Sequence, residues 1–369
     1  MPLPEDSLSE RTGNRFKWSA SHLHSSDGAK FGRVTALGIS FAAVYAGFRI
    51  LAKNSRRERL NFKDKLVLIT GGSRGLGLAM AKDFGSQGAR LAICARDAEE
   101  LHQARNILAK DGIAAHVFVC DVTKKTEVET LVEQVIAQFG RIDVLVNNAG
   151  LIKVSPLDNL EVSDFDDAMN LMFWAPFHLT MTVLPHMRKH SNGNIINIAS
   201  IGGRVSVPHL LPYSCAKFAL VGFSNGLAAE VQGHNINVLT VCPGLMRTGS
   251  YLRAEFKGKV ENEFGWFGLL GNLPGFSVAV EYAARQIREA AEARRHNCTI
   301  SLPAKILIGA DAMLPELTQT IMGAVSSLLP GAGTNSSVAG ESVNPKFGGL
   351  FQALTTLGRQ AARRWNESS

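Results

Sequence analysis

A short apolar strand that runs directly into a glycine-rich turn constrains the fold of this chain more than any other feature. Residues 66–69 read L-V-L-I without polar alternation, which is typical of a strand buried on both faces of a parallel sheet. The turn T-G-G-S-R-G-L-G follows at residues 70–77, and a helical pattern continues to about Gly88. Backbone amides in such a turn, together with a helix N-terminus, can hold a phosphate group. We therefore expect an α/β fold that binds a phosphorylated ligand.

Strand-like and helical stretches alternate from Lys65 to Leu302. This alternation predicts a Rossmann-like, doubly wound parallel sheet of about seven strands flanked by helices, within a domain at residues 60–303. The expected strands after the first lie at residues 90–94, 115–120, 142–146, 193–199, 235–241 and 298–302, and the clearest expected helices at 98–111, up to 139, 213–232 and 277–294.

Composition narrows the possible ligands. Apolar residues make up 46% of the chain, which is enough for a large core, and the net charge of +7 is mild. No stripe of basic and aromatic residues accompanies that charge, so we do not expect nucleic acid as a partner. None of the five cysteines forms a C-x-x-C pair, and no metal-ligand spacing is visible. We expect buried, reduced cysteines and no metal site.

The end of the second predicted strand indicates which dinucleotide is bound. In dinucleotide folds an acidic residue there hydrogen-bonds the free ribose 2′-hydroxyl. This chain has Ala95 at that point, Arg96 next to it, and Arg74 in the glycine turn. Two guanidinium groups near the ribose favour a 2′-phosphate, and so NADP. The alternative is that both are ordinary surface arginines.

Further turn residues follow the other strands. Asp121 and Val122 close the third strand, where Asp121 could accept a hydrogen bond from an adenine amino group. Residues 147–150 read N-N-A-G just past the fourth strand, which suits a tight turn beside a cofactor. After the sixth strand, Pro243 and Gly244 end the strand sharply, and Thr248 could reach a carboxamide or phosphate.

Ser200, Tyr213 and Lys217 form the candidate catalytic group. If Tyr213 opens a helix, Lys217 lies one turn later on the same face. A free phenol titrates near ~10, and a neighbouring lysine cation favours the phenolate and lowers that pKa. Ser200, at the end of the strand at 193–199, could then hold a substrate oxygen while Tyr213 exchanges its proton. Y-x-x-x-K by itself is common and also occurs on ordinary helices.

Taken together, these motifs resemble the short-chain dehydrogenase/reductase family in its single-domain form, over about two thirds of the chain. The resemblance rests on T-G-x-x-x-G-x-G at residues 70–77, Asp121, N-N-A-G at 147–150, Asn170, Ser200, Y-x-x-x-K at Tyr213 and Lys217, and P-G-x-x-x-T at 243–248. Each motif is weak or moderate alone, and their order and spacing make the set specific.

The resemblance assigns roles to the matching residues. Tyr213 is expected to be the acid-base catalyst, Lys217 to hold the nicotinamide ribose and lower the Tyr213 pKa, and Ser200 to orient the substrate oxygen. Asn170, which would otherwise be a helix-surface residue, is expected to hold a water that links Lys217 to solvent. The expected cofactor-binding residues are Gly71, Ser73, Arg74, Gly75, Leu76, Gly77, Arg96, Asp121, Val122, Asn148, Ala149, Gly150, Tyr213, Lys217, Pro243, Gly244 and Thr248.

The N-terminal region exceeds the family minimum. Residues 1–33 are polar and irregular, and we expect them to be disordered. Residues 34–52 are apolar with one arginine, and as a helix would span roughly 28 Å, close to the thickness of a bilayer core. We favour a membrane anchor with the catalytic domain on the cytoplasmic side, because basic residues crowd its C-terminal flank. The alternative is a helix packed on a soluble cytoplasmic protein.

The C-terminal region holds three further segments. Residues 249–276 are rich in glycine and aromatic side chains, and we interpret them as a lid over an apolar substrate. Within the extension at 304–369, we expect helices at 304–329 broken at Pro315 and a linker at 330–346. The basic amphipathic end at 350–364 could pack on a partner subunit, lie on a membrane or fray.

These patterns predict an NADP-dependent oxidoreductase that interconverts a carbonyl and a secondary alcohol. The apolar segment at 34–52 and the aromatic insertion favour a lipophilic substrate, such as a 3-oxoacyl chain, a keto-lipid or a steroid-like ring. The alternative is a non-catalytic NADP-binding sensor or scaffold at a membrane. Family members are often dimers or tetramers, so we expect a homo-oligomer.

Overall fold

The computed structural model describes residues 59–343 and 355–367 of the chain. The expected polar leader at 1–33 and the apolar segment at 34–52 lie outside the described residues. Among the helices of the described ranges, none combines the length and the apolar character that a membrane crossing requires.

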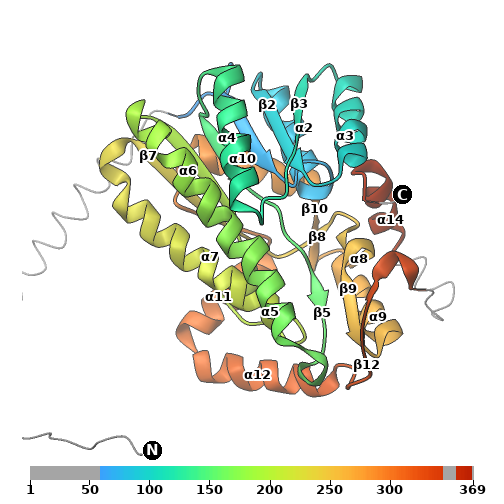
Figure 1. Cartoon of the computed structure of the whole chain (residues 1–369). Helices are drawn as coiled ribbons and strands as arrows, with labels where there is room; N and C mark the ends of the chain where they lie inside the picture. The colour runs from blue at the N-terminus through green and yellow to red at the C-terminus, as the bar shows by residue number, and fades with distance from the viewer. Residues whose placement is uncertain (1–58, 344–354, 368–369) are drawn as a thin grey trace, which may run out of the picture. The chain divides into compact units, whose positions relative to one another are not determined.

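Seven parallel strands form the central sheet, as the sequence predicts (Figure 1). Their order is β11-β7-β6-β4-β1-β2-β3. β1 pairs with β2 on one side and with β4 on the other. The order in which strands are added to the sheet therefore changes side between β1 and β4. In open α/β sheets the ligand crevice lies at the carboxyl ends of the strands at such a point. The bounds are β1 (Leu66–Thr70), β2 (Arg90–Ala95), β3 (Ala115–Val119), β4 (Val144–Asn147), β6 (Gly193–Ile198), β7 (Ile236–Pro243) and β11 (Asn297–Ile300).

Helices cover both faces of this sheet (Figure 1). On one face α2 (Gly75–Ser86), α3 (Ala98–Lys110) and α10 (Val280–Glu292) contribute to one apolar cluster. On the other face α4 (Lys125–Phe139), α6 (Ala175–Lys189) and α7 (Leu211–Glu230) contribute to a second. The central strands β1 and β4 are buried on both faces, which explains why they lack polar alternation.

The segment before α6 departs from regular α-helical geometry. α5 (Val162–Met169) leads into a π-helical turn at Asn170–Trp174, and α6 continues from it. A π turn contains more residues than an α turn, so it changes which side chains face the sheet. Short 3-10 turns occur at Leu157–Asn159, Ile201–Gly203, Gln232–His234 and Gly340–Ser342.

A small subdomain is present where we expect a lid at residues 249–276 and a linker at 330–346. The expected lid at 249–276 folds into α8 (Ser250–Arg253), β9 (Glu255–Gly258) and α9 (Val260–Asn272). Its aromatic side chains Phe256, Phe264 and Phe267 pack mainly on one another, in a separate apolar cluster. The expected linker at 330–346 contains β12 (Thr334–Ala339), which pairs antiparallel with β9, so the linker prediction is wrong there. β9 also pairs with β5 (Lys153–Val154), and β8 (Leu245–Arg247) pairs with β10 (Ser277–Ala279).

The C-terminal helices follow the predicted positions but not the predicted partners. α11 (Leu302–Met313) and α12 (Pro315–Leu328) are separated near Pro315, as expected. α14 (Thr356–Arg364) packs on the catalytic domain itself, an arrangement absent from the three alternatives. Trp365, directly after α14, is 2% exposed and belongs to the core cluster under α2 and α10. Its indole Nε1 donates a 3.3 Å hydrogen bond to Glu281 Oε1 on α10.

Candidate active site

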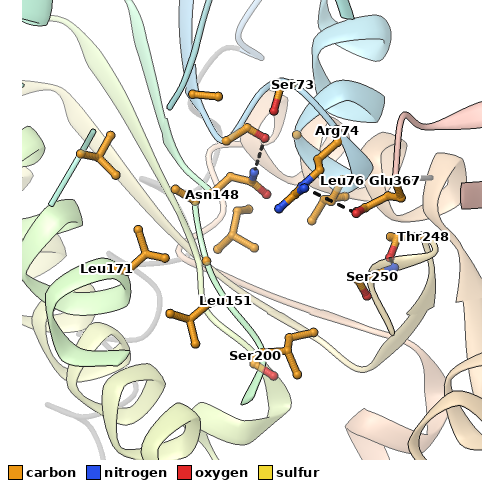
Figure 2. A pocket seen from close by; sticks show the side chains of 18 of the residues that line it. Ser73, Arg74, Leu76, Asn148, Leu151, Leu171, Ser200, Thr248, Ser250 and Glu367 are labelled. Atoms are coloured by element: carbon orange, nitrogen blue, oxygen red, sulfur yellow. Dashed lines mark hydrogen bonds and ion pairs between the residues drawn. The ribbon is translucent and has the colours of Figure 1, made fainter. Parts of the chain in front are cut away.

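A cleft of about 530 Å³ lies at the carboxyl ends of the central strands. Figure 2 shows side chains from the glycine turn, the turn after β4, the end of β6 and the turn after β7 around this cleft. The predicted residues that line it are Gly71, Ser73, Arg74, Leu76, Gly77, Arg96, Val122, Asn148, Ala149, Gly150, Ser200, Tyr213, Lys217, Pro243, Gly244 and Thr248. The fold therefore brings most residues of both predicted groups, catalytic and cofactor-binding, to one cavity.

The glycine turn is held against β4 by Asn148. The Asn148 side-chain amide donates to the carbonyl oxygens of Thr70 (2.9 Å) and Gly71 (3.1 Å), and the Thr70 hydroxyl oxygen accepts from the Asn148 backbone amide at 2.9 Å. A Cβ on Gly77 would lie 2.0 Å from the Gly71 carbonyl oxygen. Gly77 is thus required by the close approach of turn and helix. Asn148 therefore helps to fix the shape of the glycine turn.

Ser200 and Tyr213 lie together at one end of the cleft. Ser200 follows β6, and its Oγ accepts a 3.0 Å hydrogen bond from the Gly202 amide. Tyr213 lies in the first turn of α7, as expected. Burial raises the pKa of Tyr213, and a hydrogen bond with Ser200 opposes that rise. The expected lowering by Lys217 is not present in this structure, because desolvation of the phenol dominates.

Lys217 lies one turn after Tyr213 and is buried. Its Nζ donates a 2.7 Å hydrogen bond to the carbonyl oxygen of Ile198, and it lies 5.7 Å from the centre of the Tyr213 ring. Burial lowers the pKa of Lys217 to about 8. The ammonium is therefore mostly protonated at neutral pH, beside the phenol and inside the cleft.

Asn170 does not join this group. Its side chain is exposed, and it is absent from the residues that line the cleft. Met172, two residues later in the π turn, is fully buried and shares an apolar cluster with Ala216 and Tyr213. The described contacts give no support for the expected water link between Asn170 and Lys217, and that link stays a prediction. The thioether of Met172 supplies no strong donor or acceptor for a proton path.

Arg74 and Arg96 line the cleft at the end opposite Ser200 and Tyr213, and their surroundings differ. Arg96 is exposed at the end of β2. Arg74 Nη1 lies 3.0 Å from Glu100 Oε1, and Arg74 Nε lies 3.7 Å from Glu367 Oε2 (Figure 2). Arg74 is thus shared between two carboxylates, a fact that the motif itself does not reveal.

Two other predicted residues, Gly75 and Asp121, do not line the cleft. Gly75 opens α2 with a φ of +55°, a conformation that favours glycine. The Asp121 carboxylate accepts hydrogen bonds from the amide (3.1 Å) and hydroxyl (2.7 Å) of Thr123. Burial acts to raise the pKa of Asp121, but these bonds and nearby Arg96 hold it below its usual value. Asp121 shapes the loop after β3 in this structure.

Sequence reasoning missed several residues of the cleft. Apolar side chains that line it include Leu151, Ile152, Leu171 and Met246, which have no motif of their own. Glu367 also lines it, although it lies 154 residues beyond Tyr213 in the chain. No local pattern could have found Glu367, because its position depends on the packing of α14 and Trp365.

Comparisons with known proteins agree with this geometry. The sequence model described as short chain dehydrogenase matches residues 65–255. A fatty acyl-CoA reductase of Acinetobacter baylyi is 36% identical over 192 residues, which cover 52% of this chain and 65% of that reductase.

Two solved structures are also similar. A short-chain dehydrogenase from Streptomyces avermitilis is 30% identical with a TM-score of 0.62, over 72% of this chain and 98% of that one. The L-sorbose reductase of Gluconobacter frateurii, solved with NADPH and L-sorbose, is 28% identical with a TM-score of 0.59, over 65% and 96%. With the glycine turn, the seven-stranded sheet and the Ser200, Tyr213 and Lys217 group, these matches show that the chain belongs to the short-chain dehydrogenase/reductase family of oxidoreductases.

Proposed function

We propose that the protein is an NADP-dependent oxidoreductase that interconverts a ketone and a secondary alcohol on a lipophilic substrate. One observation carries the proposal: Ser200, Tyr213 and Lys217 line the same cleft as the glycine turn, Arg74 and Arg96. A hydroxyl, a phenol and an ammonium at one end suit carbonyl chemistry. Backbone amides and guanidinium groups at the other end suit phosphates.

The described residues fit a dinucleotide. The cleft is lined by the glycine turn and the end of β2, by Asn148 and Ala149, and by Ser200, so one cavity contains both proposed functional ends. Arg96 is exposed toward solvent at the expected adenosine end, where a 2′-phosphate would need a cation. The L-sorbose reductase of similar fold was solved with NADPH, which supports the same choice.

In the reductive direction the proposed catalytic side chains bind the carbonyl oxygen of the substrate and donate one proton to it. NADPH, when bound, supplies the hydride for the carbonyl carbon. Ser200 Oγ and the Tyr213 hydroxyl would both hydrogen-bond the carbonyl oxygen, and Tyr213 would donate its proton as negative charge develops there. The buried ammonium of Lys217 would then stabilise the resulting phenolate. Oxidation of the alcohol reverses each of these steps.

The character of the cleft supports a lipophilic substrate. Leu151, Ile152, Leu171 and Met246 are apolar lining residues (Leu151 and Leu171 are labelled in Figure 2). These side chains are the apolar part of a lining that also holds many polar groups, and such a part suits an acyl or ring skeleton that bears one carbonyl. The similarity to a fatty acyl-CoA reductase points in the same direction.

A turnover assay tests the proposal. Purified protein is mixed with NADPH and a panel of 3-oxoacyl thioesters, long-chain ketones, steroid ketones and short polar ketones, and loss of NADPH absorbance is followed. We expect turnover of at least one lipophilic ketone, and a loss of about 10²- to 10⁴-fold in kcat for Tyr213→Phe. Tyr282→Phe, at an exposed tyrosine on α10, is the matched control. Full activity in Tyr213→Phe would contradict the proposed acid-base role.

Membrane anchoring by residues 34–52 is a separate proposal, supported only by their apolar sequence. Cell fractionation with a high-salt wash tests it, because a spanning helix resists the wash while a surface contact does not. Recovery of the full chain in the soluble fraction would rule out a spanning helix. The expectation of a homo-oligomer also stays a prediction, and light scattering of the purified protein would test it.

A further inference from the structure

We propose that the C-terminal residues Asn366 and Glu367 are an internal competitor of the cofactor, occupying the phosphate-binding part of the cleft until the dinucleotide displaces them. The inference rests on the proposed binding of NADP in this cleft and goes beyond it. It assigns a role to the end of the chain, which lies outside the region that the family match covers.

Asn366 and Glu367 directly follow Trp365 at the end of α14, a helix that is packed firmly on the domain. On α14, Ala362 packs so closely on Gly249 that a Cβ on this glycine would lie 2.4 Å from the Ala362 Cβ. The side chain of Trp365 is buried in the core. The Arg364 guanidinium pairs with Glu281 at 3.1 Å. These contacts fix the position of α14, so a displacement by the cofactor would involve only the residues after Trp365.

Backbone and amide contacts then place the end of the chain on the glycine turn. The Gly75 amide, at the N-terminus of α2, donates a 2.8 Å hydrogen bond to the Trp365 carbonyl oxygen. The Asn366 side-chain amide donates to the carbonyl oxygens of Ser73 (3.1 Å) and Glu100 (3.2 Å). A donor at the start of a helix would otherwise be available to an anion. The end of the chain therefore uses a group suited to a phosphate.

The Glu367 carboxylate has the charge and location of a bound phosphate. Its side chain is 6% exposed, lines the cleft, and lies 3.7 Å from Arg74 Nε. A Cβ added to Gly75 would lie 2.3 Å from Glu367 Oε1, so the carboxylate rests directly on the start of α2. Figure 2 shows Glu367 directed at Arg74 across the cleft from Asn148. An anionic group of the cofactor and this carboxylate cannot occupy the same place.

The charges around Glu367 make this competition depend on pH. Arg74 of the glycine turn and Arg253 of α8 favour the carboxylate, whereas Glu100 of α3 disfavours it. Burial dominates and raises the pKa of Glu367 to about 7. Above that pH the group is an anion that pairs with Arg74 and repels phosphate. Below it the group is neutral and competes less well, so NADPH should bind more weakly as pH rises through 7.

A binding titration on the full chain tests the competition. NADPH affinity is measured by fluorescence between pH 6 and 8 for the wild type, Glu367→Gln, Glu367→Ala and the control Glu133→Gln, which changes an exposed glutamate on α4. At pH 8 both Glu367 variants should bind NADPH about tenfold more tightly than the wild type, because the competition that reduces the binding-competent fraction is lost. Their affinities should also lose the pH dependence near 7 that the wild type and Glu133→Gln retain.

Hydrogen exchange reports the displacement itself. The Glu367 amide donates a 2.8 Å hydrogen bond to the Ala362 carbonyl oxygen. Saturating NADPH should speed exchange at this amide, while the amides of α14 stay protected. Equal NADPH affinity in wild type and both Glu367 variants, or unchanged exchange at residue 367, would contradict the proposed competition. Failure of every variant to bind NADPH or NADH would instead overturn the proposed function, and the competitor with it.

Discussion

Lys217 Nζ donates a 2.7 Å hydrogen bond to the backbone carbonyl oxygen of Ile198, the last residue of the strand that delivers Ser200. One side chain thus ties the first turns of α7 to the end of β6. The tie holds the ammonium within the cleft, where burial disfavours its charge. Lys217, which the proposed chemistry needs as a cation, therefore also aligns the two segments that carry the proposed catalytic residues.

Lys217 should make stability depend on pH. The folded protein releases the Lys217 proton at a pH of about 8, whereas the unfolded chain holds it to 10.5. Between these values the unfolded state binds more protons, so the free energy of unfolding contributed by this group rises with pH, by up to about 1.4 kcal/mol per unit. Urea unfolding of wild type and Lys217→Met between pH 7.5 and 10 measures this contribution to the free energy of unfolding. A stability difference that stays constant over this range would contradict the shift.

The two arginines should contribute unequally to cofactor choice. Arg96 is exposed, whereas Arg74 is shared between Glu100 and Glu367. We expect Arg96→Ala to weaken NADPH binding about tenfold and to leave NADH binding unchanged, and Arg74→Ala to have a smaller effect. Titration calorimetry with both dinucleotides provides the values, with Arg105→Ala, an exposed arginine on α3, as control. Equal losses for NADH and NADPH would argue against a 2′-phosphate contact.

Asn170 should be dispensable for catalysis. It is exposed outside the cleft, so Asn170→Ala is expected to change kcat by less than about twofold, as for other surface substitutions. If Asn170 were a member of a proton relay, its substitution would instead lower kcat about 10²-fold or more. Steady-state kinetics across pH 6 to 9 separates the two. A large loss of kcat with normal NADPH affinity would restore Asn170 to the site.

A buried ion-pair group should stabilise the subdomain that borders the cleft. Asp164 on α5 accepts from Lys153 Nζ of β5 at 2.7 Å and from Lys257 Nζ of β9 at 2.8 Å. Asp164→Asn leaves two buried ammonium groups without their main counterion, and should cost about 3 kcal/mol of unfolding free energy. Asp166→Asn, exposed on the same helix, is the control. Chemical denaturation measures both, and equal stability of the two variants would show that the pairs contribute little.

Local patterns predicted most of the fold and most of the site. The strands β1, β2 and β7 and the helices α2, α3 and α7 lie within a few residues of their predicted positions, because apolar runs, caps and glycines act over short distances. For example, Asp97 caps α3 by accepting from the Glu100 amide. Most of the motif residues also line one cleft, since parallel strands bring their carboxyl ends to one edge.

Other features depended on contacts between distant parts of the chain. β12 exists because β9 offers it an antiparallel partner, and the sequence at 334–339 has too few apolar residues to indicate a strand alone. The side-chain direction at Asn170 depends on a π turn, which adds residues to a helical turn that the motif reads as regular.

The sequence by itself determined the strand positions, the glycine turn and the grouping of Ser200, Tyr213 and Lys217, because each arises from residues that are close in the chain. Only the tertiary structure decided how those groups are charged and what shares their cleft. Burial sets the pKa directions of Tyr213 and Lys217, and burial is a property of the assembled fold. Glu367 reaches Arg74 only because Trp365 packs into the core, a contact with no local signature.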